Sequence, residues 1–143
     1  MEENQISNCD NKKIIFTEPN PKVYTISNFL DDATCAHFIN IAQKKGVNEA
    51  LVSDNKKGYV SKGRTGKNCW ISHNTDEITT SVGNRISEVV GLPLVNAEAY
   101  QVIYYGETQE YKQHYDSWDH DGSEKSRRCM KFGGQRMITA LCY

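Results

Sequence analysis

The sequence predicts an α+β fold in which helices pack on one face of an antiparallel sheet. Apolar residues recur at helical spacing in the first part of the chain, up to residue 90, whereas β-forming residues dominate after Pro93. Helices followed by strands are typical of α+β layer structures, not of alternating α/β folds. The chain shows no internal repeat.

Composition is typical of a single globular domain, with 143 residues, 38% hydrophobic residues and a net charge of −1. The 17 basic and 18 acidic residues are interspersed, so we expect no nucleic-acid partner. Neither a secretory signal nor a membrane-spanning run is found, so we expect no membrane association and, by default, a cytoplasmic protein. Five cysteines without C-x-x-C spacing predict free thiols. Oligomeric state stays open.

The first half of the chain predicts a flexible terminus, a strand and two helices. Residues 1–12 are polar, and residues 13–16 form a short strand ended by the prolines that follow. An Asp31-Asp32 pair precedes a helix over residues 33–45, which Gly46 ends. Residues 47–67 predict a long loop or a mobile hairpin.

The second helix is predicted over residues 76–90, capped by Asn74 or Thr75 and ended by Gly91 and Pro93. After this helix, the helical spacing of apolar residues gives way to runs of β-forming residues. Three extended segments are predicted, over residues 100–105, 111–116 and 135–143, with a charged, glycine-bearing insertion over 117–134.

His114 and Asp116 are the candidate metal ligands. Residues two apart in a strand point to the same face, so an imidazole and a carboxylate would lie side by side. This pairing matches part of the two-histidine, one-carboxylate arrangement of non-haem Fe(II) oxygenases. A surface hydrogen bond between the two side chains is the alternative, and the motif alone does not decide between them.

Three spaced motifs follow one another here: Glu98-x-x-Gln101-Val102-x-x-Tyr105, Tyr111-x-x-His114-x-Asp116 and Gly134-Gln135-Arg136-x-x-Thr139-x-Leu141-x-Tyr143. Upstream lie Arg64-Thr65 and Trp70, with Gly66 where a serine is usual. In this order and spacing, the motifs resemble the prolyl 4-hydroxylase (alpha-subunit catalytic domain) branch of the 2-oxoglutarate and Fe(II)-dependent dioxygenases. The resemblance covers roughly residue 22 onward and is strongest after Glu98.

The resemblance implies a double-stranded β-helix, or jelly-roll, with N-terminal helices on its major sheet. It also implies an oxidoreductase that hydroxylates peptidyl proline, as procollagen-proline 4-dioxygenase does, while 2-oxoglutarate is decarboxylated to succinate. The cofactors would be Fe(II), 2-oxoglutarate as co-substrate and L-ascorbate, and the partner would be a proline-containing peptide or protein. The identity of that substrate stays open.

The resemblance also implies residue roles. His114 and Asp116 correspond to iron ligands. Tyr105 and Thr139 correspond to residues that bind 2-oxoglutarate, and Arg64, Glu98 and Tyr111 correspond to substrate-binding residues. The motifs assign no catalytic residue beyond the metal ligands.

The family pattern continues to a distal histidine and a lysine that have no counterpart here. We therefore expect residues 13–143 to be the N-terminal portion of such a domain, with an incomplete sheet, in a chain that is a fragment with doubtful activity alone. Two alternatives are a catalytically incomplete peptide-binding module and a small divalent-metal site built from His114, Asp116 and His120.

Overall fold

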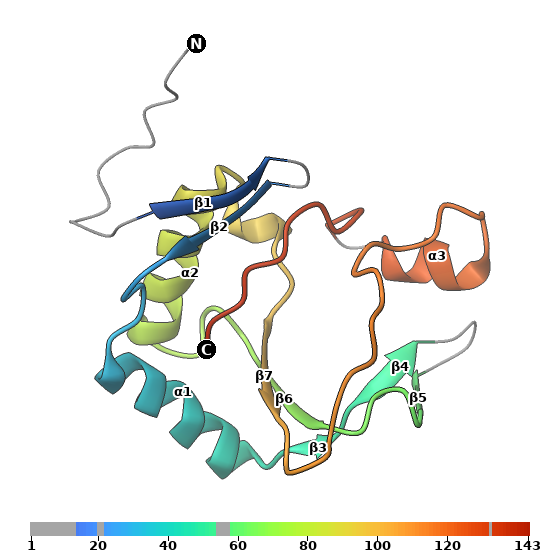
Figure 1. Cartoon of the computed structure of the whole chain (residues 1–143), viewed down its shortest axis with the longest axis horizontal. Helices are drawn as coiled ribbons and strands as arrows, with labels where there is room; N and C mark the ends of the chain where they lie inside the picture. Colours follow the sequence, from blue (N-terminus) through green and yellow to red (C-terminus); the bar gives the residue numbers. More distant parts are fainter. Residues whose placement is uncertain (1–13, 20–21, 54–57, 132) are drawn as a thin grey trace. The chain divides into compact units, whose positions relative to one another are not determined.

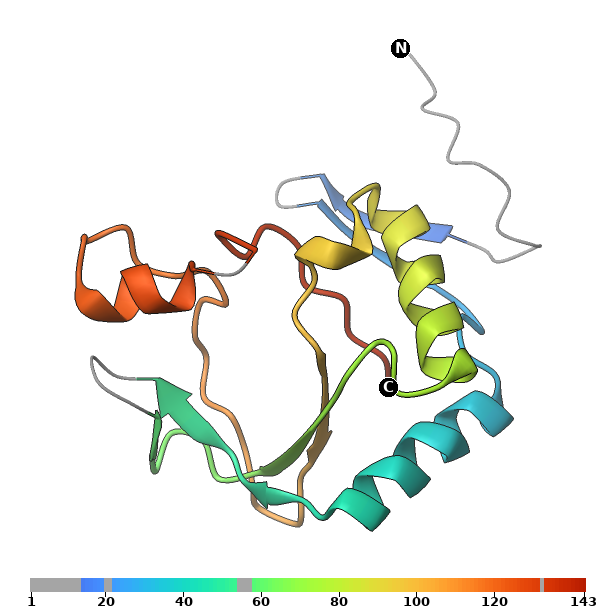
Figure 2. The same ribbon diagram turned by 180° about the vertical axis from the view of Figure 1, so that it is seen from behind.

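The structure, a computed structural model, describes residues 14–19, 22–53, 58–131 and 133–143 (Figures 1 and 2). It confirms the α+β class, since helices accompany small antiparallel sheets. The chain divides into two compact units, Met1–Ala36 and His37–Tyr143. In the described part of the chain, every helix is too short or too polar to cross a membrane.

The first unit contains one antiparallel strand pair, β1 (Ile14–Pro19) with β2 (Lys22–Ile26). The strand predicted over residues 13–16 is confirmed from residue 14 and runs further than expected. Its proline is the last residue of the strand, where a missing N–H costs least. The flexible terminus predicted for residues 1–12 lies outside the described residues.

Helix α1 (Asp32–Lys45) starts in the first unit and continues into the second. The carboxylate of Asp31 accepts a hydrogen bond from the backbone N–H of Thr34 at 2.7 Å, which satisfies one of the free donors of the first turn. Gly46, with φ of 79°, follows the last helical residue. The predicted helix is therefore confirmed within one residue.

The second unit is built on a three-stranded antiparallel sheet in the order β3 (Asn48–Glu49), β6 (Lys67–Ile71) and β7 (Tyr100–Tyr104). A separate hairpin pairs β4 (Leu51–Ser53) with β5 (Gly58–Val60). The region predicted as a loop or hairpin, residues 47–67, therefore contains the hairpin, strand β3 and the first residue of β6.

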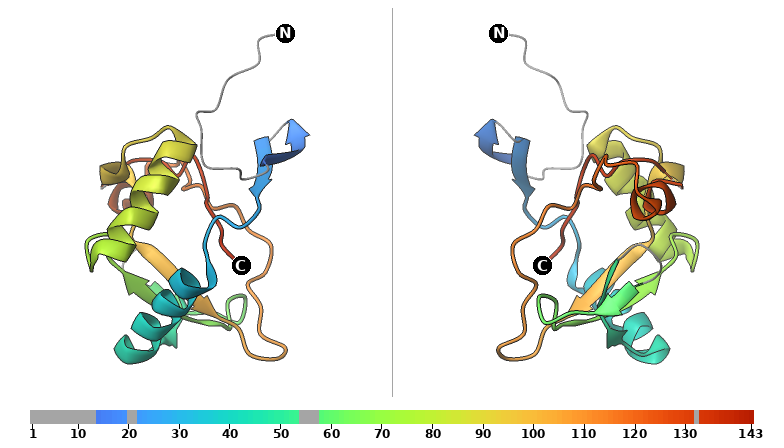
Figure 3. Two further views of the ribbon diagram at one scale, coloured as in Figure 1. Left: turned by 90° about the vertical axis from the view of Figure 1, so that its left-hand side faces the viewer. Right: turned by 90° about the vertical axis from the view of Figure 1, so that its right-hand side faces the viewer.

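The core lies between α1 and one face of β6 and β7 (Figure 3). Cys69 and Ile71 alternate along β6 onto this face and pack with Ala42 of α1. Tyr100, paired with Ile71 across the strands, extends the core toward α2 (Glu77–Val90). Its hydroxyl donates to the backbone carbonyl of Thr79 in α2 at 2.7 Å. Both helices therefore cover the same face of the sheet.

Asp76 caps α2, so the predicted caps Asn74 and Thr75 are wrong by one or two residues. The Asp76 carboxylate accepts from the Thr79 N–H at 2.8 Å, while the Thr79 hydroxyl accepts from the Asp76 N–H at 2.9 Å. This reciprocal pair is a capping box. The other oxygen of Asp76 lies 2.7 Å from Nε2 of His37, which ties α1 to α2. The predicted end of α2 at Gly91 is confirmed.

The two later strand predictions are wrong. Residues 111–116 form only an isolated bridge at Tyr111, and residues 135–143 are irregular. A strand needs a neighbour to satisfy its backbone groups, and none of the described strands pairs with residues 135–143. The predicted insertion instead contains a short helix, α3 (Glu124–Cys129). A 3₁₀ turn, η1 (Leu94–Asn96), follows α2.

Truncation of Ile71 should destabilise the second unit strongly. Its side chain is fully buried, with 0% exposure, so Ile71→Ala removes apolar contacts and leaves a cavity. We expect a loss of about 3 kcal/mol in the free energy of unfolding, measured by urea denaturation. Ile39→Ala, at a site 53% exposed, is the control and should cost less than about 1 kcal/mol. Equal losses would contradict the assigned core.

Asp76 should make stability depend on pH in the acid range. Hydrogen bonding from the Thr79 backbone N–H, with smaller contributions that include His37, lowers the pKa of Asp76 below 3.8. The lowered value stabilises the folded chain above pH about 4, and that stability is lost as pH falls through the folded pKa. Asp76→Asn keeps a capping side chain but cannot titrate there. Its melting temperature should fall less steeply than the wild type's as the pH is lowered below about 4.

Candidate metal centre

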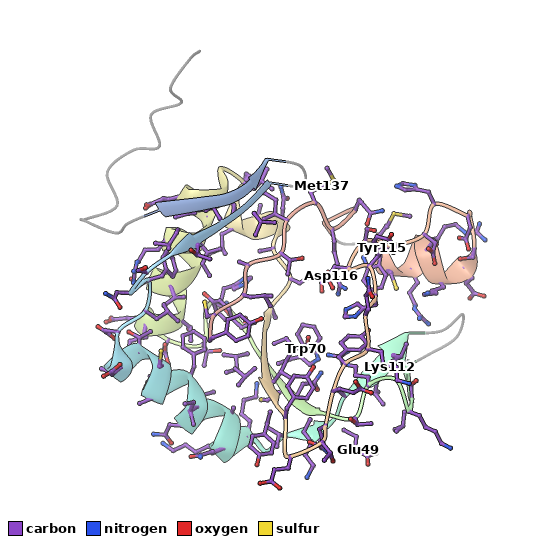
Figure 4. All side chains as sticks on the ribbon, in the orientation of Figure 1. Glu49, Trp70, Lys112, Tyr115, Asp116 and Met137 are labelled. Atoms are coloured by element: carbon purple, nitrogen blue, oxygen red, sulfur yellow. The ribbon has the colours of Figure 1, made fainter. Side chains whose placement is uncertain are left out.

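His114 and Asp116 lie on the irregular segment that follows β7, close to the labelled Lys112 and Tyr115 (Figure 4). Nε2 of His114 is 3.1 Å from Oδ1 of Asp116. Both side chains are partly exposed, at 36% and 43%. The predicted juxtaposition is therefore present, although a turn of the chain, not a strand, produces it.

The tautomer of His114 is set by the backbone. Nδ1 lies 2.8 Å from the carbonyl oxygen of Lys112. A carbonyl only accepts hydrogen bonds, so Nδ1 carries a proton. Nε2 donates to Oδ1 of Asp116 when it is also protonated, and in the neutral ring its lone pair faces that oxygen and is available to a metal cation.

The spacing of these two atoms fits a shared metal ion. Two ligand atoms that each lie about 2.1 Å from a divalent metal, at a right angle, are about 3.0 Å apart. The observed 3.1 Å between Nε2 and Oδ1 agrees with that distance. An Nδ1–H bound to a backbone carbonyl is also the usual way in which proteins orient a metal-binding imidazole.

Thr139 contacts the second oxygen of Asp116. Its hydroxyl donates a hydrogen bond of 2.6 Å to Oδ2. This bond leaves Oδ1 as the oxygen that faces His114. The residue associated with 2-oxoglutarate by resemblance is therefore a direct partner of the candidate ligand.

Arg64, Tyr111 and His114 form a stack. The Tyr111 ring lies 3.7 Å from the His114 ring at 22°, and the Arg64 guanidinium lies 4.6 Å from the centre of the Tyr111 ring. Arg64 is only 9% exposed and donates to the carbonyl of Leu51 at 2.9 Å, so the loop predicted to be mobile buries it. The stack restrains the plane of the imidazole.

Backbone contacts fix the same stack to the loop at residues 63–65. Arg64 and Tyr111 form an antiparallel bridge. On its two sides, Thr65 N–H donates to the carbonyl of Glu110 at 3.0 Å, and Lys112 N–H donates to the carbonyl of Gly63 at 2.9 Å. The segment that carries His114 is therefore hydrogen-bonded to this loop.

Tyr105 packs directly on Gly66. A Cβ atom added at Gly66 would lie 2.5 Å from Cε1 of the Tyr105 ring. Only glycine permits this approach, which gives a physical reason for the absence of the usual serine. Tyr105 is 41% exposed.

Glu98 is paired with Arg136. Nε and Nη2 of the arginine donate to the two carboxylate oxygens at 2.5 and 2.6 Å. These hydrogen bonds raise the pKa of Arg136. The guanidinium also lies 4.0 Å from the centre of the Trp118 ring. Arg136 belongs to a sequence motif, but the motif alone indicates no role for it. Its partners Glu98 and Trp118 are 18 or more residues away in the sequence.

A cleft of about 440 Å³ lies beside β6, and Arg64, Trp70 and Gln101 are among its lining residues. Gln101 belongs to the first spaced motif, and Arg64 and Trp70 are the upstream residues of the resemblance. Trp70 and Gln101 are paired across β6 and β7 and project from the face opposite the core. Figure 4 shows Trp70 on the side of the sheet that faces the segment bearing Asp116.

His120 does not join the pair. Among residues 14–19, 22–53, 58–131 and 133–143, no three histidine, cysteine, aspartate or glutamate side chains gather as a metal site would require. His37 bonds to Asp76, and His73 packs edge-on against Tyr100 at 4.7 Å, where burial lowers its pKa. Within the described part of the chain, no third side chain joins His114 and Asp116.

No family model matches the chain. Among curated proteins of Arabidopsis thaliana, it is 34% identical over 125 residues to prolyl 4-hydroxylase 2 and 32% identical over 132 residues to prolyl 4-hydroxylase 5. It is also 32% identical over 125 residues to "Probable prolyl 4-hydroxylase 7". These matches cover 86%, 92% and 86% of this chain, but only 40%, 43% and 37% of the relatives. The chain thus spans less than half of their length.

Gly66→Ala should displace the Tyr105 ring. The new methyl group would overlap Cε1, so the ring must turn away from β6. With 3-fluorotyrosine incorporated, we expect a changed ¹⁹F chemical shift for Tyr105, assigned with Tyr105→Phe. Gly63→Ala is the matched control, because its Cβ would meet only Ser61 Oγ at 3.5 Å. An unchanged Tyr105 signal in Gly66→Ala would contradict the close packing.

Proposed function

Because the chain belongs to the prolyl 4-hydroxylases over the residues that it spans, we propose that it acts in the Fe(II)- and 2-oxoglutarate-dependent hydroxylation of peptidyl proline. The observation that carries the proposal is the placement of two potential ligand atoms, Nε2 of His114 and Oδ1 of Asp116, 3.1 Å apart. A divalent cation would bind both atoms, and the relatives' names indicate the reaction.

His114 and Asp116 would hold the iron. A neutral imidazole and a carboxylate suit Fe(II), because this ligand type is typical of non-haem iron oxygenases. Bound iron would supply the oxidising chemistry that inserts oxygen into a C–H bond, with 2-oxoglutarate converted to succinate and carbon dioxide and L-ascorbate keeping the metal reduced. The protein contributes ligand orientation through the Lys112 carbonyl and the Thr139 hydroxyl.

Tyr105 and Thr139 would bind 2-oxoglutarate. A phenol and a hydroxyl each donate one hydrogen bond, which suits a dicarboxylate that loses water contacts on entering a site. Thr139 donates its one hydroxyl proton to Asp116 in the structure, so it would turn that proton from Oδ2 to the co-substrate when 2-oxoglutarate binds. Tyr105 is held near β6 by its packing on Gly66.

A proline-containing peptide is the proposed substrate, with the cleft beside Arg64, Trp70 and Gln101 as its approach. Tyr111 lies between Arg64 and His114, so a peptide bound against this stack would lie near the metal. Glu98 would bind the substrate while its carboxylate stays paired with Arg136. An exposed aromatic side chain such as Trp70, at 45%, suits contact with a proline ring.

For the fold, we propose a double-stranded β-helix whose major sheet includes β3, β6 and β7, with residues 13–143 forming the N-terminal portion of a dioxygenase domain. The antiparallel pairing of these strands and the helices on one face support it. The open face that carries Trp70 and Gln101 would be the interior side, which faces the metal.

Metal binding tests the proposed centre. Co(II), a spectroscopic substitute for Fe(II), should bind the chain, and His114→Ala or Asp116→Asn should weaken its Kd by more than about tenfold, since each removes a ligand. Visible absorption and titration calorimetry measure this. His120→Ala is the control and should bind as the wild type does. Wild-type affinity in His114→Ala would exclude the centre.

Turnover tests the activity. With Fe(II), ascorbate and a proline-rich peptide, the protein should form succinate from 2-oxoglutarate in step with hydroxyproline, and Asp116→Asn should abolish both products. Mass spectrometry of the peptide and an assay of succinate provide the two measurements. Peptide binding without either product would favour a binding module over an enzyme.

A further inference from the structure

We propose that Gln135 and Arg136 are positioning residues, forming a clamp that holds the turn bearing Asp116 in the shape that metal binding needs. The inference rests on the proposed metal centre and extends it to side chains that are not among its proposed ligands. It arises from a set of contacts between residues 135–139 and residues 116–118.

Gln135 binds both backbone groups of Trp118. Its Oε1 accepts from the Trp118 N–H at 2.7 Å, and its Nε2 donates to the Trp118 carbonyl at 2.7 Å. A side-chain amide has the same donor and acceptor as a peptide group, so Gln135 pairs with Trp118 as a neighbouring strand would. These bonds replace the strand pairing that the segment around Asp116 lacks.

Arg136 makes three contacts at once. Its Nε and Nη2 bind the carboxylate of Glu98, its plane stacks on Trp118, and Nη1 lies 3.4 Å from the carbonyl of Asp116. Glu98 precedes β7 by two residues, so the guanidinium connects the ligand-bearing turn to the sheet. Only arginine combines a planar fork with stacking, and lysine does not.

Thr139 completes the clamp by its bond to Oδ2 of Asp116. Gln135 and Arg136 hold the backbone of the turn, while Thr139 orients the carboxylate. The turn is thereby ordered before a metal arrives, so binding does not bear the entropy cost of ordering it. Residues that orient metal ligands in this way typically change metal affinity by 10–100-fold when they are altered.

The test compares Co(II) affinity in Gln135→Met and Arg136→Lys with the wild type. Met matches Gln in length but cannot pair with Trp118, and Lys keeps the charge but loses the fork and the stack. We expect Kd to rise by about tenfold or more in each variant. Arg127→Lys, at an exposed arginine in α3, is the matched control and should leave Kd unchanged.

A second control separates positioning from stability. Val82→Ala, at a buried site in α2 far in sequence from the clamp, should lower the melting temperature without changing Kd for Co(II). In the metal-free protein, hydrogen exchange at the Trp118 amide should be faster in Gln135→Met than in Val82→Ala.

The outcomes are distinct. A Kd in Gln135→Met and Arg136→Lys equal to the wild type's would overturn the clamp and leave the metal centre intact. The clamp would also be overturned if Val82→Ala, with the same melting temperature as the two clamp variants, lost as much affinity for Co(II) as they do. A Kd for Co(II) that stays at the wild-type value in both His114→Ala and Asp116→Asn would instead refute the metal centre, and the clamp with it.

Discussion

The antiparallel pairing of β6 with β7 is the interaction on which the second unit depends. It sends Cys69 and Ile71 to one face, where α1 and α2 cover them, and Trp70 to the other. Because a strand alternates its side chains, the pairing that builds the core also creates an uncovered face with motif residues on it. The same strand pairing therefore determines which residues form the core and which face the candidate site.

The candidate ligands themselves lie outside regular structure. Contacts within this segment and one with Thr139 supply the order that strands would give: the Lys112 carbonyl binds Nδ1 of His114, the Tyr111 ring stacks on the imidazole, and Thr139 donates to one oxygen of Asp116. The last of these contacts joins residues 23 apart in the sequence. The geometry of the site is therefore more sensitive to remote substitutions than that of a site built on a helix or strand.

Local signals explain what the sequence predicted well. Both helices have caps, a glycine end and periodic apolar residues within one short stretch, so their bounds follow from nearby residues. The predicted strands at residues 111–116 and 135–143 do not form, because β-forming residues need a partner strand to pair with. The proximity of His114 to Asp116 was predictable from spacing. The pairing of Glu98 with Arg136 was not, because it joins residues 38 apart.

The bridge between Arg64 and Tyr111 makes the loop at residues 63–65 and the imidazole of His114 parts of one mechanical unit. Movement of the loop would also turn the ring of this candidate metal ligand, because backbone hydrogen bonds and ring stacking join the two. In the proposed centre, a substrate that contacts this loop would therefore also change the orientation of a metal ligand.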